Sequence, residues 1–238
     1  MPATTTTLPA PFTWAGEHVG IDLPHGAKAV FTTRRGGVSD PPFDTLNLGR
    51  WTDDDPAAID ENRERLLGLI GVRRVAFGRQ VHGAAVVRDG AELVEADAQV
   101  VTERGVGAMV LTADCLPIAL AAPGAAGMVH AGWRGIAAGV VEAAVREAGA
   151  VQAAAIGPCA RGCCYEVGDE VRAALGVEPA GGPALVDLSA IARERLRAAG
   201  VGTVHDSGLC TMCSDASLFF SHRRDGGRTG RQAGVAWR

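Results

Sequence analysis

The sequence predicts a single α+β domain built from mixed β-sheets. Segments with helical and strand periodicity alternate along the chain, but too irregularly for a doubly wound parallel sheet. The chain has no internal repeat and no low-complexity linker, and its 238 residues, 47% of them hydrophobic, suffice for one large core. We therefore expect one domain over residues 12–238, preceded by a disordered leader at residues 1–11 that is rich in Thr and Pro.

The N-terminal half contains one helix with clear start and stop signals. Asp55 is a typical N-cap, Pro56 suits the first helical position, and the helix is expected to run to about Gly71. The side chains at helical spacing within it are Ile59, Arg63, Leu66, Leu67 and Ile70. A strand is predicted before this helix, at residues 29–33, and two more after it, at residues 75–81 and 84–88.

The C-terminal half alternates short apolar runs with helical patterns. Strands are predicted at residues 105–112, 116–121, 127–130, 151–156, 201–205, 218–221 and 234–237. Helices are predicted at residues 136–149 and 165–175, and a third, capped by Asp187, runs through residue 199.

The overall composition excludes several classes of protein. A net charge of −4 provides no global basic field for nucleic acid or an anionic membrane. No apolar run is long enough to span a bilayer, and the N-terminus lacks the pattern of a signal peptide. Six cysteines without a secretion signal favour a cytoplasmic protein whose thiols are reduced or bind metal.

Three potential metal ligands share an unusual placement. His82, Cys115 and His130 each end a strand-like run and come directly before a bend in the chain. Each of them alone is explained equally well by packing or hydrogen bonding. Together, a thiolate and two imidazoles suit zinc, with copper as a competitor. Three protein ligands leave a fourth position free for water or substrate, as catalytic zinc requires.

The neighbours of these residues have candidate supporting roles. Asp114 precedes Cys115 and should point to the opposite face of its strand, so it is expected to support the site rather than bind the metal. Trp133 and Arg134 follow His130 and could roof a pocket there, with Arg134 supplying a cation. Plain packing is the alternative for Trp133.

Several polar residues are candidate binders of an anionic substrate. Planar, permanently charged guanidinium groups suit phosphate. The candidates for substrate binding are Arg34, Asn47, Arg134 and Arg224. Arg63 lies on an amphipathic helix and is better explained as a solvated surface residue.

The remaining cysteines allow three interpretations. Cys210 and Cys213 form a Cys-x-x-Cys pair, and Cys159, Cys163 and Cys164 provide further thiols. They could hold a second, structural zinc ion, or form a redox pair. Because the spacing from Cys159 to Cys164 is not that of a regular zinc knuckle, we favour reduced thiols packed near the site.

Five sequence elements together carry a resemblance to a known family. These are QVHG, ADCLPI, HAGWRG, the LNLG at residues 46–49 and the C-terminal FFSHRRDGGRTGRQ. In this order, over residues 29–237, they resemble the multicopper polyphenol oxidase or laccase-domain family. Members of that family have also been described as zinc-dependent purine nucleoside phosphorylases, and one bacterial branch as the peptidoglycan editing factor.

The resemblance implies a fold, a metal site and an activity. It implies an α/β/β/α layered arrangement and a single zinc ion bound by His82, Cys115 and His130. The "multicopper" name is misleading for this chain, which contains no His-x-His pair from which a copper cluster could be built. The expected partners are a nucleoside and phosphate, and the sequence leaves the oligomeric state open.

The expected activity is phosphorolysis of purine nucleosides: adenosine, inosine or methylthioadenosine. The same metal site could deaminate adenosine, although the H-x-E motif of zinc deaminases is missing. The proton carrier is left unassigned, with Asp114 and the zinc-bound water as the two candidates. One alternative is a hydrolase or amidase that edits peptidoglycan precursors, with Cys115 as nucleophile and His130 as base. A polyphenol oxidase is a second alternative, and a binding protein whose zinc is structural is a third.

Overall fold

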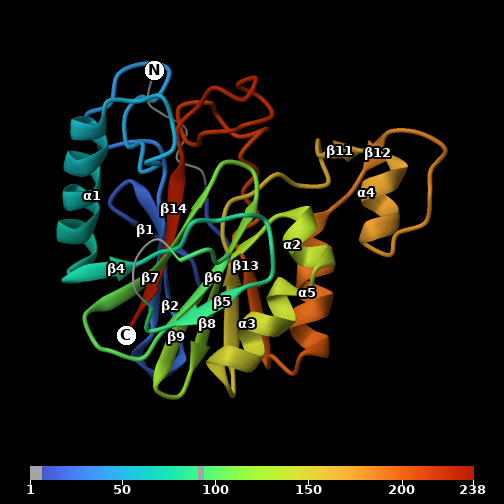
Figure 1. Cartoon of the computed structure of the whole chain (residues 1–238), viewed down its shortest axis with the longest axis horizontal. Coiled ribbons are helices and arrows are strands. Elements are labelled where there is room, and N and C mark those ends of the chain that lie inside the picture. The colour runs from blue at the N-terminus through green and yellow to red at the C-terminus, as the bar shows by residue number, and fades with distance from the viewer. Residues whose placement is uncertain (1–6, 91–93) are drawn as a thin grey trace.

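The chain forms two six-stranded sheets packed face to face, with helices on both outer surfaces (Figure 1). This architecture comes from a computed structural model that describes residues 7–90 and 94–238. The first sheet runs in the order β1 (Thr13–Ala15), β2 (His18–Asp22), β3 (Lys28–Phe31), β14 (Gln232–Trp237), β7 (Val106–Thr112) and β4 (Arg74–Ala76). Its strands are antiparallel except that β4 pairs with β7 in parallel.

The second sheet supplies most of the site described below. Its strand order is β13 (Thr203–Asp206), β10 (Ala153–Ile156), β8 (Leu116–Ala122), β9 (Ala125–Ala131), β6 (Ala98–Val101) and β5 (Val86–Arg88). The two edge pairs are parallel and the central pairs antiparallel. The prediction of an α+β domain with mixed sheets is therefore confirmed.

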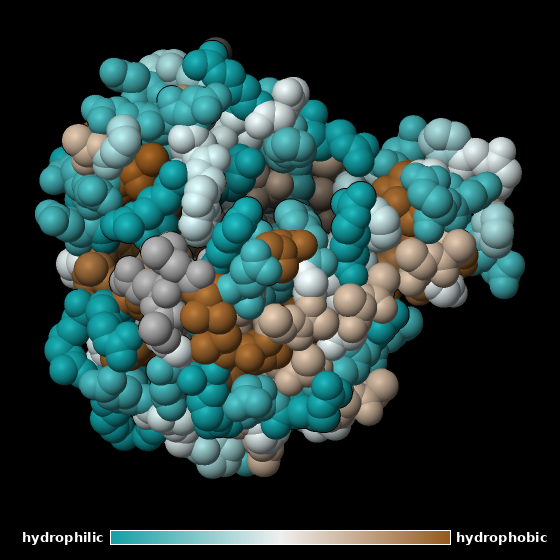
Figure 2. All heavy atoms as spheres, viewed as in Figure 1, coloured by the Kyte–Doolittle hydropathy of each residue, from teal (hydrophilic) through white to brown (hydrophobic). Residues whose placement is uncertain are grey.

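The described residues form five α-helices and one 3-10 turn. They are the 3-10 turn η1 (Pro24–Gly26), α1 (Pro56–Ile70), α2 (Trp133–Ala137), α3 (Val140–Ala148), α4 (Asp169–Ala174) and α5 (Leu188–Ala198). Helix α1 packs on the first sheet, and α3 and α5 pack on the second. A small hairpin of β11 (Glu166–Val167) and β12 (Ala184–Leu185) carries α4 on an arm that stands away from the main body (Figures 1 and 2).

Side-chain alternation explains the layering. In β8, Ala119 and Ala121 face the first sheet, whereas Ile118 and Leu120 face the helices. Every residue of β7, β8 and β9 is buried, as expected for strands covered on both faces. Small alanines on the inner face let the two sheets approach closely.

The capping signals of the two longest helices act as the sequence indicated. The Asp55 carboxylate accepts a hydrogen bond from the Ala57 amide at the start of α1, and Gly71 ends the helix in the left-handed conformation. The Asp187 carboxylate accepts hydrogen bonds from the Ser189 and Ala190 amides at the start of α5.

Several predicted elements differ in the structure. The single helix at residues 136–149 is divided into α2 and α3, because Gly139 takes a left-handed conformation with φ 86° between them. The helix at 165–175 is instead the short strand β11 followed by α4. The strand at 75–81 shrinks to β4, and β1, β2 and β6 were not predicted.

The predicted strand at residues 218–221 is a buried loop. Phe219 and Phe220 are fully buried, which explains the apolar signal. The Gln232 side chain accepts from the Phe220 amide and donates to the Phe220 carbonyl, so it satisfies backbone groups that a neighbouring strand would otherwise pair.

The N-terminal segment is described only in part. Residues 1–6 of the predicted leader lie outside the described residues, and Leu8 packs partly buried against the core between the sheets. None of the helices in the described ranges combines the length and apolar character needed to cross a membrane.

Candidate metal-binding active site

The structure brings His82, Cys115 and His130 together. Their ligand atoms all lie within 4.8 Å of one another, and the two imidazole rings meet edge to face with centroids 4.8 Å apart. Cys115 comes directly before β8 and His130 lies near the end of β9, so the pairing of these two strands places them side by side. His82 reaches them from the loop between β4 and β5.

A buried carboxylate, Asp97, holds two of these three residues in place. Its Oδ1 lies 2.7 Å from His130 Nδ1 and accepts a hydrogen bond of 2.9 Å from the His82 amide. Its Oδ2 accepts from the amides of Val81 and Gly83 at 3.1 and 2.8 Å. Because Nδ1 of His130 is committed to this carboxylate, Nε2 remains for the site, an arrangement common among metal-ligating histidines.

The charges at the site favour a thiolate. Burial by itself would raise the pKa of Cys115, but the neighbouring imidazoles of His130 and His82 outweigh burial and lower that pKa. Burial likewise works against a charge on His130, but Cys115 and Asp97 raise the pKa of His130. The pKa of Asp97 is lowered because its hydrogen bonds from His130 and Gly83 outweigh its own burial. The site therefore carries a thiolate, the form of cysteine that binds metal.

Two backbone features allow this close approach. A Cβ atom on Gly132 would lie 3.0 Å from Cys115 Sγ and 3.1 Å from the His82 ring, so any larger residue there would crowd both side chains. His82 itself has φ 59°, in the left-handed region. His82 takes this conformation as the central residue of the tight turn 81–83, whose three backbone amides all donate to Asp97.

Asp114 has a structural role. Its Oδ1 accepts from the Thr211 hydroxyl at 2.7 Å and its Oδ2 accepts from the Arg223 amide at 2.8 Å. Asp114 is buried and is not among the residues that line the pocket described below. These hydrogen bonds fit the supporting position expected for Asp114, and its suggested part in proton transfer stays a prediction.

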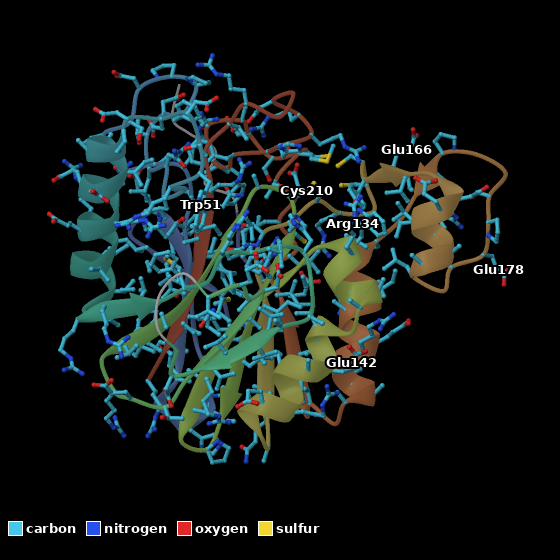
Figure 3. All side chains as sticks on the ribbon, in the orientation of Figure 1. Trp51, Arg134, Glu142, Glu166, Glu178 and Cys210 are labelled. Carbon is cyan, nitrogen blue, oxygen red and sulfur yellow. The ribbon has the colours of Figure 1, made fainter. Side chains whose placement is uncertain are left out.

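The three residues line an open pocket of about 300 Å³. The pocket wall is formed by Gly49, Trp51, Thr52, Gln80, His82, Leu111, Thr112, Ala113, Cys115, His130, His222 and Arg231. Trp51 is 56% exposed at the rim (Figure 3). A volume of this size suits a small organic ligand.

Arg231 is the cation of this pocket. Its Nη1 donates to the carbonyls of Thr229 and Gly230 at 2.8 and 2.9 Å. Within the described ranges it forms no ion pair with a carboxylate, unlike Arg34 or Arg224. Burial lowers the pKa of Arg231, while Cys115 and Asp114 favour its charged form. A partly buried arginine without an acidic partner is a suitable binder for an anion.

Asn47 supports the pocket from behind. Its Oδ1 accepts from the amides of Arg231 and Gly49, and its Nδ2 donates to the Thr52 hydroxyl and to Asp54. Asn47 is fully buried and does not line the pocket, so it positions three residues that do. Asn47 was predicted to bind substrate; in the structure it instead positions residues that line the pocket.

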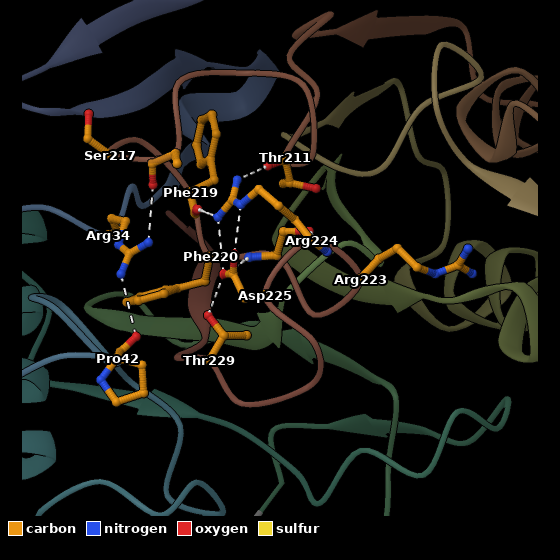
Figure 4. Close-up of polar contacts among 12 residues, drawn as sticks. Arg34, Pro42, Thr211, Ser217, Phe219, Phe220, Arg223, Arg224, Asp225 and Thr229 are labelled. Carbon is orange, nitrogen blue, oxygen red and sulfur yellow. Dashed lines mark hydrogen bonds and ion pairs between the residues drawn. The ribbon is translucent and has the colours of Figure 1, made fainter.

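The structure does not bring Arg34 and Arg224 to the pocket. The Arg34 guanidinium pairs with Asp44, donates to the Pro42 and Ala216 carbonyls, and stacks over Phe220 (Figure 4). Arg224 pairs with Asp225 and donates to the carbonyls of Thr211 and Phe219. Both groups hold loops together, which leaves them unavailable for a ligand.

Arg134 and Arg63 also lie outside the pocket lining. Arg134 is exposed and its guanidinium stacks on the Trp133 ring at 4.2 Å (Figure 3). Arg63 is buried rather than solvated, and donates twice to the Leu48 carbonyl. Trp133 packs partly buried against the core beneath the second sheet, as the packing alternative proposed.

Sequence reasoning missed Asp97, Arg231 and His222. Arg231 lies in the TGRQ segment that ends the C-terminal motif, but its local sequence does not distinguish it from the neighbouring arginines. Asp97 follows a polar stretch, and its importance appears only when β6 places it beside the 81–83 turn.

Comparisons with known proteins identify the family of this chain. A family described as multi-copper polyphenol oxidoreductase laccase matches residues 28–238. The chain belongs to this laccase-like family. It is 42% identical to a purine nucleoside phosphorylase of Pseudomonas aeruginosa, covering 90% of this chain and 94% of the relative. It is 44% identical to a purine nucleoside phosphorylase of Streptomyces coelicolor, covering 91% and 97%.

Solved structures of this laccase-like family share the fold. The crystal structure of YlmD from Geobacillus stearothermophilus matches with a TM-score of 0.87 at 34% identity, covering 95% of this chain and 97% of the other. The hypothetical protein YfiH of Bacillus licheniformis matches with a TM-score of 0.88 at 28% identity, covering 96% and 99%. The predicted family is therefore confirmed.

Proposed function

We propose that this protein is a zinc-dependent purine nucleoside phosphorylase, which cleaves the bond between ribose and purine with inorganic phosphate. The observation that carries the proposal is one pocket in which three metal-ligating side chains face an arginine that has no acidic partner among the described residues. The relatives named purine nucleoside phosphorylase support the choice of substrate.

The donor set fits a single zinc ion. His82, Cys115 and His130 offer two imidazole nitrogens and one sulfur within 4.8 Å, a set that suits zinc, with copper as the competing metal. Asp97 fixes the orientation of His130 for this role. When bound, the metal supplies a Lewis acid that polarises an oxygen of the phosphate or of the nucleoside.

Arg231 binds the phosphate in this proposal. Two of its hydrogen bonds, to the Thr229 and Gly230 carbonyls, hold the guanidinium in a fixed orientation. A guanidinium held in this way can donate paired hydrogen bonds to two phosphate oxygens. Asn47 fixes the backbone of Arg231, so the cation is placed before the substrate arrives.

The rim of the pocket suits the purine base. Trp51 exposes a large aromatic face there, and stacking between an aromatic side chain and a base is favourable whichever base is present. His222 lines the same pocket and is the residue we assign to protonate the departing purine, since an imidazole can act as a general acid.

Adenosine deamination is a secondary reaction that the same pocket could support. Zinc deaminases use a glutamate as general acid and base. No glutamate lines the described pocket, so His222 would have to take this role. Phosphorolysis needs His222 only to give one proton to the departing purine, which is why it is the main proposal.

A cysteine hydrolase that acts on peptidoglycan precursors is the alternative. The lowered pKa of Cys115 beside His130 favours it, because a thiolate and imidazolium pair can act without metal. In both cases we place the protein in the cytoplasm, where its six free thiols stay reduced.

Incubation with inosine, with and without phosphate, tests these proposals. The expected product is ribose 1-phosphate, formed only with phosphate, and Cys115→Ala is expected to lose the zinc ion of the pocket and this product. Arg146→Met, on the exposed side of α3, is the control and should behave as the natural protein. An active protein that is free of metal and inactivated by alkylation at Cys115 would favour the hydrolase instead.

A further inference from the structure

Four cysteines gather outside the pocket, and they are called here the four-cysteine cluster. Its members are Cys163, Cys164, Cys210 and Cys213. All four sulfur atoms lie within 4.8 Å of one another. The loop that leads to β11 supplies two of them and the loop after β13 supplies the other two, and Figure 3 locates Cys210.

We propose that the four-cysteine cluster is a second, structural zinc site. The sulfur of Cys163 lies 3.7 Å from that of Cys164 and 3.5 Å from that of Cys213, and Cys164 lies 3.4 Å from Cys210. A tetrahedral zinc ion with Zn–S bonds of about 2.3 Å would hold its sulfurs about 3.8 Å apart. The observed spacings are close to this value, so one ion fits with little movement.

The chemistry of the donors selects zinc and a structural role. Four thiolates in tetrahedral arrangement are the usual ligands of structural zinc, and they leave no position open for water or substrate. This distinguishes the four-cysteine cluster from the pocket, where only three side chains meet.

Exposure argues against simple packing of reduced thiols. Cys163 and Cys213 are exposed, whereas cysteine that acts as a small apolar side chain is usually buried. Cys159 provides the contrast within this chain, because it is fully buried and lies outside the cluster. The packing interpretation therefore suits Cys159, but not Cys163 and Cys213.

The backbone holds the two halves of the cluster in register. Cys159 and Cys210 form a parallel β-bridge, in which the Cys159 amide donates to Leu209 and the Thr211 amide donates to Cys159. The Cys213 amide donates to the Cys210 sulfur at 3.4 Å, which stabilises negative charge on that sulfur. Because the ligands are already held together before the metal binds, little free energy is spent on ordering them.

A zinc ion here would brace the wall of the pocket. Thr211, next to Cys210, donates its hydroxyl to Asp114, and the Ala160 amide donates to the Asp114 carbonyl. Asp114 is adjacent to Cys115. The four-cysteine cluster thus ties together the two loops that hold the bend before the pocket cysteine.

Metal analysis of the protein purified with a thiol reductant tests the proposal. We expect about two zinc ions per chain in the natural protein and about one in the double variant Cys163→Ser/Cys213→Ser. Cys115→Ser should also retain about one, because it removes the pocket ion instead. Cys159→Ala is the matched control and should keep both ions.

A second measurement uses the natural protein and therefore does not require any variant to fold. Iodoacetamide labelling followed by mass spectrometry should find Cys163 and Cys213 protected in the zinc-loaded protein and reactive after a chelator removes the metal. Ready labelling of these exposed thiols in zinc-loaded protein would overturn the proposal. So would two disulfides among the four cysteines, or iron in place of zinc. Each result is obtained without measuring nucleoside cleavage.

Discussion

Replacing Asp97 with asparagine tests whether one carboxylate organises the pocket ligands. The natural side chain accepts four hydrogen bonds, from the amides of Val81, His82 and Gly83 and from His130 Nδ1. An asparagine oxygen can replace only one of the two carboxylate oxygens. The amide nitrogen then takes the place of the other oxygen and faces the two groups that donated to it. At about 1.5–3 kcal/mol for each lost bond to a charged acceptor, the turn loses about 3 kcal/mol or more.

The effect on the metal follows from the two orientations that the amide can take. If the nitrogen replaces Oδ1, it donates to His130 Nδ1 and moves the imidazole proton to Nε2, the nitrogen needed for the metal. If it replaces Oδ2, it repels the Val81 and Gly83 amides, and the turn that carries His82 moves. In either orientation we expect zinc affinity to fall about 10- to 100-fold, which is about 1.4–2.7 kcal/mol.

Competition with a chromophoric zinc chelator measures this change. Asp89→Asn is the matched control, since the Asp89 carboxylate also accepts from a backbone amide but lies at an exposed turn, bonded to Thr102. The control should bind zinc as the natural protein does. If Asp97→Asn also binds zinc with natural affinity, the role assigned to this carboxylate is wrong.

Three further predictions concern the phosphate, the close approach at Gly132 and the response to acid. Arg231→Met should reduce kcat/KM for phosphate about 100-fold with zinc retained, in steady-state assays of inosine cleavage, and Arg146→Met should not. Equal loss of activity in both variants would contradict the phosphate role. Gly132→Ala should weaken zinc binding about tenfold, because the added methyl group crowds Cys115 and His82. Gly68→Ala is the control and should bind zinc normally, since its methyl group meets open space in α1. Equal zinc affinity in the two variants would refute this steric reasoning. Burial lowers the pKa of His18 from 6.5 to about 4. The unfolded chain therefore takes up a proton first, and stability falls between pH 6.5 and pH 4 by up to about 3 kcal/mol. Urea unfolding of His18→Gln across this range should show a shallower fall, and an unchanged slope would contradict the assignment.

The clustering of the three candidate metal ligands could be predicted because strand ends are visible in a sequence. Apolar runs that stop at a bend mark where a side chain leaves the sheet, and the β8–β9 pairing then places Cys115 beside His130. The sequence does not show which strands pair. When two consecutive strands form a hairpin, however, the start of the first lies beside the end of the second, as it does for β8 and β9.

The substrate-binding arginines could not be predicted in the same way. Arg34, Arg224 and Arg231 all lie near glycines and polar turns, so their local sequences are equivalent. What separates them is tertiary contact, because Asp44 and Asp225 neutralise the first two. No sequence pattern shows which guanidinium keeps its charge available.

Strands β1, β2 and β6 could not be predicted for a similar reason. Strands β1 and β2 are short, and β6 is a run of four residues whose strand character depends on pairing with β9. At residues 218–221 a strand was predicted where the structure has a buried loop. The apolar pattern there comes from Phe219 and Phe220, which are buried as part of the core.

The position of β14 has a consequence for the order of folding. This strand lies between β3 and β7, and Thr32 exchanges hydrogen bonds with Ala233 across some 200 residues of chain. Contacts so distant in sequence form slowly. The ligands of the pocket come from the other sheet and a loop beside it, so a refolding chain is able to capture metal before β14 inserts. Arg231 directly precedes β14, and catalytic competence should therefore return later than metal capture during renaturation.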